Sequence, residues 1–467
     1  MVDEREYIEM VPSAKRMIGS MRDLGYDFVK AVADIVDNSI EANATEIKIT
    51  MEFKGDHSWV LIADNGKGMT ADELNEGMRF GTEREYTGNE LGKFGLGMKT
   101  APISQCRKLT VASKSAAPES DIVIRQLNLE RIEETNRWEI TSIPKEDYSE
   151  ILWKSLEEHS GTVIMWENLD RMLQYDPPDG MRAEKGFLNL ARELEQHLGM
   201  VFNRFISGEL GENKKLSVTL NGNVVKAWDP FARDERATVA LEKKSLAAFG
   251  TGGVFMVMYS PFILPPKEKF SSSAAFNRMA GPAGWNDQQG FYIYRENRLI
   301  QSGGWCRMRL KDEHIKLARI ALDLHSDSDS SLGLNIMKSN INLPRDLKDK
   351  LSPMVKEVVK LALKVYTPEK KTDGHRNPSG DAGQKPVSGT DSSTGVFVSR
   401  NTYGNHASGT ETSNASPPHA VTVVEKTTGL AGALEKAARM VGELEALHKI
   451  RNALKAEDPD SATRIGW

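Results

Sequence analysis

Four polar side chains recur at helical spacing near the N-terminus: Asp34, Asp37, Asn38 and Glu41. Positions i, i+3, i+4 and i+7 share one face of a helix, so we expect three carboxylates and one amide to lie together on a helix spanning residues 26–44. Carboxylate and amide oxygens are suitable ligands for Mg²⁺, which takes further ligands from phosphates and water. A solvated acidic helix face is the alternative interpretation.

A second group of residues follows an expected strand. Asp64 comes directly after the apolar run 59–63, and Gly66, Gly68 and Met69 follow it in a D-x-G-x-G motif. Two glycines permit a tight turn, and the carboxylate can accept a hydrogen bond from an exocyclic amine such as that of adenine. Ordinary turns use the same residue types, so this motif alone leaves both interpretations open.

The segment 81–97 is rich in glycine and ends in LGKFGLGMKT, which contains Gly92, Gly95, Gly97 and Lys99. Glycines at this spacing let backbone N–H groups approach phosphate oxygens, and a helix that begins after them favours anions at its N-terminus. The segment lacks the G-K-[ST] of a P-loop in the required position. We therefore expect a phosphate lid of another kind, with an ordinary mobile loop as the alternative.

A Gly161-Thr162 pair at the start of an expected strand completes an ordered set of four motifs. The order of these motifs resembles that of the GHKL ATPase superfamily, which includes DNA gyrase B, MutL mismatch-repair proteins, heat-shock chaperones and histidine kinases. Within it, the lid GKFGLGMKTA and the later YRENRLI are most similar to the microrchidia (MORC) ATPases and their bacterial relatives. The motifs cover residues 20–170, and the similarity over 185–365 is lower.

The resemblance implies a site for ATP and Mg²⁺. Asn38 would hold Mg²⁺ and the phosphates, and Asp64 would accept from the adenine amino group with support from Thr162. The residues expected to shape the base pocket are Gly66, Gly68 and Met69. The residues expected to wrap the phosphates are Gly92, Gly95, Gly97 and Lys99.

Catalysis would be carried out by Asp34 and Lys338. In the family the residue four before the asparagine is usually the general base, a glutamate; here it is Asp34, one methylene shorter, which affects turnover more than ATP binding. MutL- and gyrase-like members bring a lysine from a second domain to the γ-phosphate. The segment LGLNIMKSNINLP resembles that region and contains Lys338, with a lysine on a loop flank as the alternative.

We expect an α+β fold: a Bergerat (GHKL) sandwich followed by a transducer-like α+β domain, a disordered linker and a C-terminal helix. The expected boundaries are 1–178 and 182–367 for the two domains, 368–422 for the linker, which is rich in Gly, Ser, Thr and Pro, and 427–456 for the amphipathic helix.

Local patterns give the elements of the second domain. A helical pattern over 182–205 leads into a hairpin with its turn at Asn221-Gly222, and we expect this hairpin to begin the second α+β unit. A strand over 290–300, a helix over 313–322 and a final helix over 351–366 follow.

The charge and hydrophobic composition of the chain limits the partners that it is expected to bind. The chain has 467 residues with 61 basic and 66 acidic ones, a net charge of −5, so no overall positive field gathers nucleic acid. The most basic window, 291–320, has seven basic and three acidic residues and gives a possible DNA contact, with an ordinary charged surface as the alternative. The N-terminus has no signal peptide and no stretch approaches a membrane span, so we expect a cytoplasmic protein without membrane contact.

Two functions agree with these features. The first is an ATPase that hydrolyses ATP slowly and uses ATP binding to drive homodimer closure on a protein or DNA partner. The second is a nucleotide-gated binding or chaperone-like module with negligible turnover. A histidine kinase is disfavoured because the first histidine, His57, lies inside the expected ATP domain.

Overall fold

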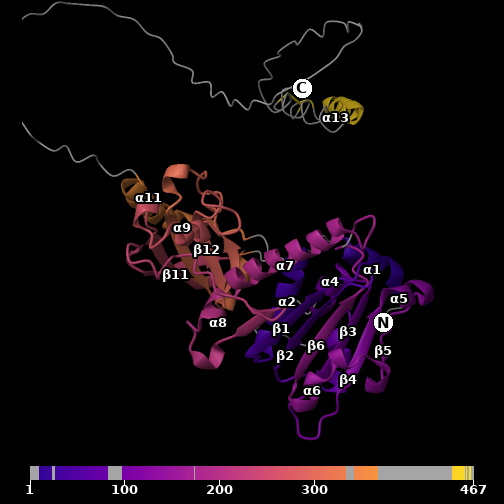
Figure 1. The fold of residues 1–467 in the computed structure, drawn as a ribbon. Helices are drawn as coiled ribbons and strands as arrows, with labels where there is room; N and C mark the ends of the chain where they lie inside the picture. The colour runs from indigo at the N-terminus through magenta and orange to yellow at the C-terminus, as the bar shows by residue number, and fades with distance from the viewer. Residues whose placement is uncertain are drawn as a thin grey trace, which may run out of the picture. The chain divides into compact units, whose positions relative to one another are not determined.

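The computed structural model describes residues 10–23, 27–81, 97–172, 174–332, 341–366, 444–457, 459 and 462–463. The chain divides into two units, residues 1–375 and 376–467. The first unit contains two β-sheets, each with helices packed against it (Figure 1), which confirms the expected α+β class. In the second unit the structure describes the helix α13 (Leu444–Glu457), which overlaps the expected C-terminal helix.

The first sheet has eight strands in the order β5-β4-β3-β6-β2-β1-β7-β8. Its central strands pair antiparallel, and β7 adds to β1 in parallel. The strands are β1 (Glu46–Glu52), β2 (Trp59–Asp64), β3 (Lys108–Lys114), β4 (Val123–Asn128), β5 (Thr141–Ser142), β6 (Gly161–Glu167), β7 (Ser217–Leu220) and β8 (Asn223–Val224).

Helices pack on one face of this sheet. In β2, Val60 and Ile62 contribute to the core shared with the helices, whereas Trp59 and Leu61 belong to a smaller apolar cluster on the other face. This two-residue alternation is the pattern of a strand buried on both sides. The helices of the main core are α1 (Ala14–Arg22), α2 (Phe28–Glu41), α3 (Ala71–Met78), α4 (Gly97–Ile103), α5 (Leu129–Thr135), α7 (Met181–Val201) and α8 (Asn203–Ser207).

The smaller cluster is covered by a segment without long elements. Leu152 and Leu156 pack there against Val163 and Met165 of β6. The short helices of this segment are the 3-10 turns η1 (Lys145–Asp147) and η2 (Glu150–Leu152) and the α-helix α6 (Ser155–Glu158).

The second sheet has the order β10-β11-β14-β12-β13, with β9 paired to β11. The helix α11 packs on it through an apolar stripe that includes Leu351, Val355 and Val358. The strands are β9 (Val239–Ala240), β10 (Lys244–Gly250), β11 (Gly253–Ile263), β12 (Gly290–Arg295), β13 (Arg298–Ser302) and β14 (Ala318–Leu324). The helices are α9 (Ser273–Met279), α10 (Asp329–Leu332) and α11 (Arg345–Tyr366).

Helix α7 belongs to both cores. Leu194 and Leu198 lie in the core of the first sheet, and Met200, near the C-terminal end of the helix, lies in the core of the second. At this end the Gly199 carbonyl accepts a hydrogen bond from the N–H of Trp228, at 2.9 Å. The two sheets are therefore joined by a shared helix, and α7 also contacts β13.

The structure corrects two expectations about the second domain. The hairpin at Asn221-Gly222 forms β7 and β8, but β7 pairs with β1, so the hairpin extends the first sheet instead of beginning the second. The helix expected over 313–322 is wrong: only the short 3-10 turn η5 (Glu313–Ile315) forms there, and the strand β14 follows. The expected domain boundaries themselves remain predictions.

Several predicted residues lie outside the described part of the chain. These are Gly92 and Gly95 of the expected lid, Lys338, the whole of the expected linker 368–422, and residues 427–443 of the expected terminal helix. Among the residues that are described, no helix is long and apolar enough to cross a membrane.

Candidate functional site

Helix α2 buries two of its acidic residues. Its N-terminus is capped by Asp27, and its apolar residues pack into the core of the first sheet. Asp34 and Asp37 are buried as well, while Asn38 and Glu41 are half-buried. A solvated acidic helix face is therefore excluded, since buried carboxylates require hydrogen-bonding or charged partners.

One partner of these carboxylates comes from the second sheet. Arg298, at the start of β13, donates from Nε to Asp37 Oδ1 at 2.7 Å, and its Nη2 lies 3.7 Å from Asp34 Oδ1. The guanidinium carbon also lies 5.8 Å from the centre of the Phe202 ring. Sequence reasoning missed this contact, because nothing local links residue 298 to residue 37.

His197 of α7 belongs to the same electrostatic environment. Burial, followed by the positive charges of Arg298 and Lys30, lowers its pKa to about 4, while Asp37 acts in the opposite direction. The imidazole is therefore neutral near pH 7. Arg298 is the positively charged residue that donates to Asp37 at 2.7 Å.

Asp64 is held at the end of β2 by hydrogen bonds to both of its carboxylate oxygens. Its Oδ1 accepts from the Gly66 N–H at 2.9 Å, and its Oδ2 accepts from the Ser39 hydroxyl at 2.9 Å. Burial raises the pKa of Asp64, and hydrogen bonds from Gly66, Ser39 and the backbone of Thr162 oppose that rise. Since a carboxylate has about four acceptor sites and these three bonds use three of them, the group can still accept from a ligand.

A serine that sequence reasoning missed connects the other base-pocket residues. The Ser113 hydroxyl donates to the Gly161 carbonyl at 2.9 Å and accepts from the Met69 N–H at 2.9 Å. Its oxygen lies 3.0 Å from that of Thr162. Thr162 in turn lies opposite Asp64 in the β2–β6 ladder, so Asp64, Met69 and Thr162 meet at one edge of the first sheet.

The two motif glycines are required by close backbone approach. Gly68 has φ of +63°, and a Cβ on it would lie 1.9 Å from the Lys114 carbonyl oxygen. A Cβ on Gly66 would lie 2.7 Å from the Cβ of Ala42, just beyond α2. The D-x-G-x-G turn is thus packed between the end of α2 and the end of β3, where no larger residue fits.

Lys99 is the predicted phosphate-wrapping residue whose side chain the structure describes. It lies in α4, which begins at Gly97, and it is 1% exposed. Its ammonium donates to the backbone carbonyl of Arg79 and lies 5.9 Å from the Phe80 ring centre. Burial lowers the pKa of Lys99 to about 8, against a raising effect of Glu76. Its role toward phosphate remains a prediction.

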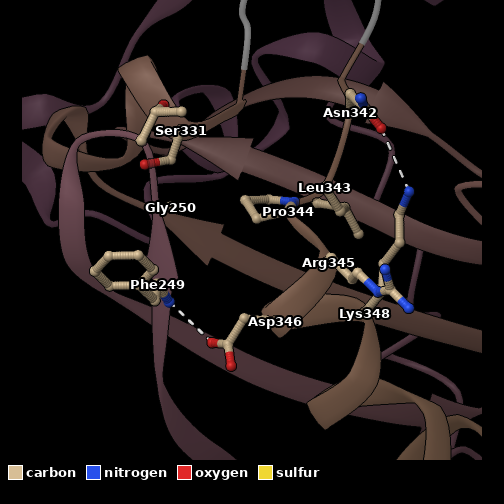
Figure 2. Close-up of a pocket in the computed structure, with 10 residues that line it drawn as sticks. Phe249, Gly250, Ser331, Asn342, Leu343, Pro344, Arg345, Asp346 and Lys348 are labelled. Carbon is tan, nitrogen blue, oxygen red and sulfur yellow. Dashed lines mark hydrogen bonds between the residues drawn. The ribbon is translucent and has the colours of Figure 1, made fainter.

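The residues on either side of the segment that contains Lys338 lie on the second sheet (Figure 2). Asp346 accepts from the Phe249 N–H at 2.9 Å, and Lys348 donates to Asn342 Oδ1 at 3.3 Å. These residues, with Ser331, line a hollow of about 710 Å³ between β10, α10 and the start of α11. Among the residues that the structure describes, no predicted nucleotide residue lines this hollow.

The basic window 291–320 is largely neutralised within the chain. Arg319 is fully buried and donates to the carbonyls of Pro230 and Met279, at 2.7 and 2.8 Å. Four other basic residues form ion pairs: Arg295 with Asp329, Arg298 with Asp37, Lys311 with Asp287, and Lys316 with Glu313. This window therefore gives little support to DNA binding.

Comparison with known proteins agrees with this geometry. Residues 26–162 match the family described as histidine kinase-, DNA gyrase B- and HSP90-like ATPase. A segment of 107 residues is 33% identical to the MORC family CW-type zinc finger protein 3 of Mus musculus, covering 22% of this chain and 11% of that protein. Segments of 93 and 94 residues are 36% and 35% identical to the DNA mismatch repair protein MutL of Vibrio parahaemolyticus and of Pseudoalteromonas translucida.

These two matches each cover 19% of this chain and 14% and 15% of the relatives, so the chain spans a small part of the length of the curated relatives that it matches. The matched family and the fold of its region confirm the resemblance seen in the motifs. Residues 26–162 therefore match a GHKL-type family, and segments of the chain are similar to MORC and MutL proteins.

Proposed function

We propose that this chain binds ATP together with Mg²⁺ and hydrolyses the nucleotide slowly. The observation that carries the proposal is the fixed carboxylate of Asp64, which Ser39 and Gly66 hold in one orientation and which retains acceptor capacity. A buried carboxylate with free acceptor capacity at the edge of a sheet suits the amino group of adenine.

The chemistry of α2 suits the phosphate end of the same ligand. Asn38 is half-buried and carries its amide one residue before Ser39, the residue that holds Asp64. An amide oxygen is a suitable ligand for Mg²⁺, so Asn38 is the residue that would hold the ion. When bound, Mg²⁺ supplies charge that stabilises the developing negative charge of the phosphates.

For hydrolysis, Asp34 is the proposed general base. It lies one turn before Asn38 on the same helix face, where it can accept a proton from a water that attacks the terminal phosphate. The shorter aspartate side chain supports slow turnover, because the water must lie closer to the helix or be reached through another water. The alternative function, a nucleotide-gated or chaperone-like module with negligible turnover, uses the same binding site without this step.

Binding of ATP is further proposed to close a homodimer, with Lys338 reaching the γ-phosphate and Lys99 with the expected lid wrapping the phosphates. The partner on which closure acts is a protein or DNA. The name of the MutL relatives places them in DNA mismatch repair, which supports a DNA partner, whereas the neutralised basic window argues against contact through residues 291–320.

Calorimetric titration of the full chain with ATP tests the proposal, with Mg²⁺ and with EDTA, alongside Asp64→Asn. We expect binding that Mg²⁺ strengthens in the wild type and no detectable binding in Asp64→Asn, because the amide presents donors in place of the second acceptor. Phosphate release under the same conditions separates the ATPase from the silent binder. Equal ATP affinity of the two proteins would contradict the assignment of Asp64.

A further inference from the structure

The β12–β13 hairpin carries two arginines at its tip that face each other. Glu296 and Asn297 form the turn with φ of +46° and +69°, and Arg295 pairs across the ladder with Arg298. Like charges directly opposite in an antiparallel pair are destabilising unless each is neutralised. Each of these arginines donates to a carboxylate, and the two carboxylates, Asp329 and Asp37, lie on different helices.

The two ion pairs connect the hairpin to two different helices, α10 and α2. Arg295 binds Asp329 of α10 through two hydrogen bonds of 2.7 and 2.8 Å, and this pair stays within the second sheet and its helices. Arg298 binds Asp37 of α2 at 2.7 Å, and this pair crosses from the second sheet to the helix that carries Asp34 and Asn38. The hairpin tip therefore connects the second sheet to the proposed hydrolytic face.

Burial makes the crossing pair a strong constraint. Arg298 is 7% exposed and Asp37 is 0% exposed, so water screens their attraction only weakly. A charged hydrogen bond of 2.7 Å fixes both distance and direction. Asp34 lies 3.7 Å from the same guanidinium, within ion-pair range and beyond hydrogen-bond length for that pair of atoms. Lys30 and His197 are further charged or titratable groups of this environment among the described residues.

We propose that Arg298 is a positioning residue for hydrolysis, through which the second sheet holds α2 so that Asp34 points at the attacking water. The inference rests on the proposed ATPase function. Arg298 acts through Asp37 and Asp34 and does not itself contact the nucleotide. A misplacement of about 1 Å in a reacting group can cost about a hundredfold in rate, so losing this hold lowers turnover while leaving ATP affinity nearly unchanged.

The test separates positioning from simple stability. Arg298→Gln alone removes the cation that donates to the buried Asp37 at 2.7 Å, so a lower unfolding temperature accompanies any loss of turnover. Arg298→Gln combined with Asp37→Asn removes both charges and keeps the shapes of the side chains. We expect this double variant to regain most of the unfolding temperature but to keep a kcat about ten- to a hundredfold below wild type, with KM for ATP unchanged.

A conservative variant and a matched control pair complete the experiment. Arg298→Lys keeps the cation and is expected to retain part of the turnover. The matched control is Arg204→Gln with Asp323→Asn, because that ion pair joins α8 to β14 beside the same hairpin and does not involve α2. We expect the control pair to turn over ATP at close to the wild-type rate.

Hydrogen exchange of the nucleotide-free proteins gives a readout independent of activity. The amides of α2 should exchange faster in the Arg298→Gln, Asp37→Asn protein than in wild type and in the control pair. Recovery of wild-type kcat in that double variant, an equal loss in the control pair, or unchanged exchange of α2 would each overturn the positioning role. Absence of ATP binding by the wild type would overturn the proposed function instead, and the exchange of α2 would still report on Arg298.

Discussion

The hydroxyl oxygen of Ser39 lies 2.9 Å from Oδ2 of Asp64 and joins helix α2 to the end of strand β2. Ser39 directly follows Asn38, the proposed Mg²⁺ ligand. The residue proposed to accept from adenine and the residue proposed to hold the metal are therefore fixed to each other through one serine. The distance between these two residues is therefore set before a ligand binds. This preorganisation lowers the entropic cost of binding a ligand that contacts both of them.

Ser39→Ala should weaken ATP binding about tenfold, since a hydrogen bond to a charged group is worth about 1.5 to 3 kcal/mol and Gly66 still holds the other oxygen of Asp64. Calorimetric titration measures this loss. Ser58→Ala is the matched control, because Ser58 is also a buried serine next to β2 and donates to the Gly55 carbonyl, away from Asp64. Equal affinities of the Ser39 and Ser58 variants would contradict the role of Ser39.

Asp34→Ala should abolish turnover while leaving ATP binding largely intact. General-base assistance typically contributes about a hundredfold to ten-thousandfold, so the loss should be visible against a slow wild type in a single-turnover phosphate-release assay. Asp34→Glu restores the residue usual in the family and is expected to retain turnover. If Asp34→Ala hydrolyses ATP at the wild-type rate, Asp37 or Glu41 becomes the next candidate for the base.

Lys99 gives a pH dependence with a definite sign. Its folded-state pKa of about 8 is below the value of a free lysine, so between these values the unfolded chain binds more protons, and folding stability should rise as pH increases through this range. A phosphate contact favours the charged form, so ATP affinity should fall as pH rises through about 8. Lys99→Met should remove both slopes, while Lys48→Met, an exposed lysine of β1, should keep them. An ATP affinity of Lys99→Met equal to wild type at pH 7 would show that Lys99 has no phosphate role.

His197 should make the fold sensitive to acid. Its folded-state pKa of about 4 is lower than the ordinary 6.5, so the unfolded chain binds the proton more readily, and stability present at neutral pH is lost as pH falls from 6.5 toward 4. Each unit of displacement corresponds to about 1.4 kcal/mol. His197→Gln should flatten urea-unfolding free energies over this range, and His57→Gln, an exposed histidine, should not. Identical pH profiles of wild type and His197→Gln would exclude this histidine as the cause.

The motifs could be predicted because their signals are local. The spacing of Asp34, Asp37 and Asn38 follows from one helical period, and the glycines after Asp64 are required by contacts within a few residues of a turn. Ser39 and Ser113 could not be recognised, because serine is common and their partners lie 25 and more than 40 residues away. The Arg298–Asp37 pair spans 261 residues, and only folding brings its members together.

The helix predicted over 313–322, where the strand β14 forms, was wrong because the deciding contacts are again distant in the sequence. Ile315, Ala318 and Leu322 fit a helical stripe, yet Ile320, Leu322 and Leu324 also fit the two-residue period of a strand. Pairing with β11 on one side and β12 on the other decides in favour of the strand. The hairpin at Asn221-Gly222 was recognised from its turn, but which sheet it joins depends on β1, far away in the sequence.

ATP, more than ADP, should drive the chain from monomer or open dimer to a closed dimer, with Lys338 as the residue that senses the γ-phosphate. A ligand shifts a conformational equilibrium only by its difference in affinity between the two states, and a lysine that reaches the γ-phosphate in the closed state alone supplies such a difference. A charge-assisted contact of this kind is worth about 1.5 to 3 kcal/mol, or roughly ten- to a hundredfold in the closure equilibrium.

Light scattering with a non-hydrolysable ATP analogue, with ADP and without nucleotide measures this shift. The wild type should gain mass with the analogue only, and Lys338→Ala should lose that gain while still binding nucleotide in calorimetry. Lys348→Ala is the matched control: it removes a nearby lysine whose ammonium donates to Asn342, and it should associate like the wild type. Equal mass of the wild type in all three conditions would refute nucleotide-driven association. A dimer of Lys338→Ala as abundant as that of Lys348→Ala would refute only the part given to Lys338, since closure would then depend on other contacts to the γ-phosphate.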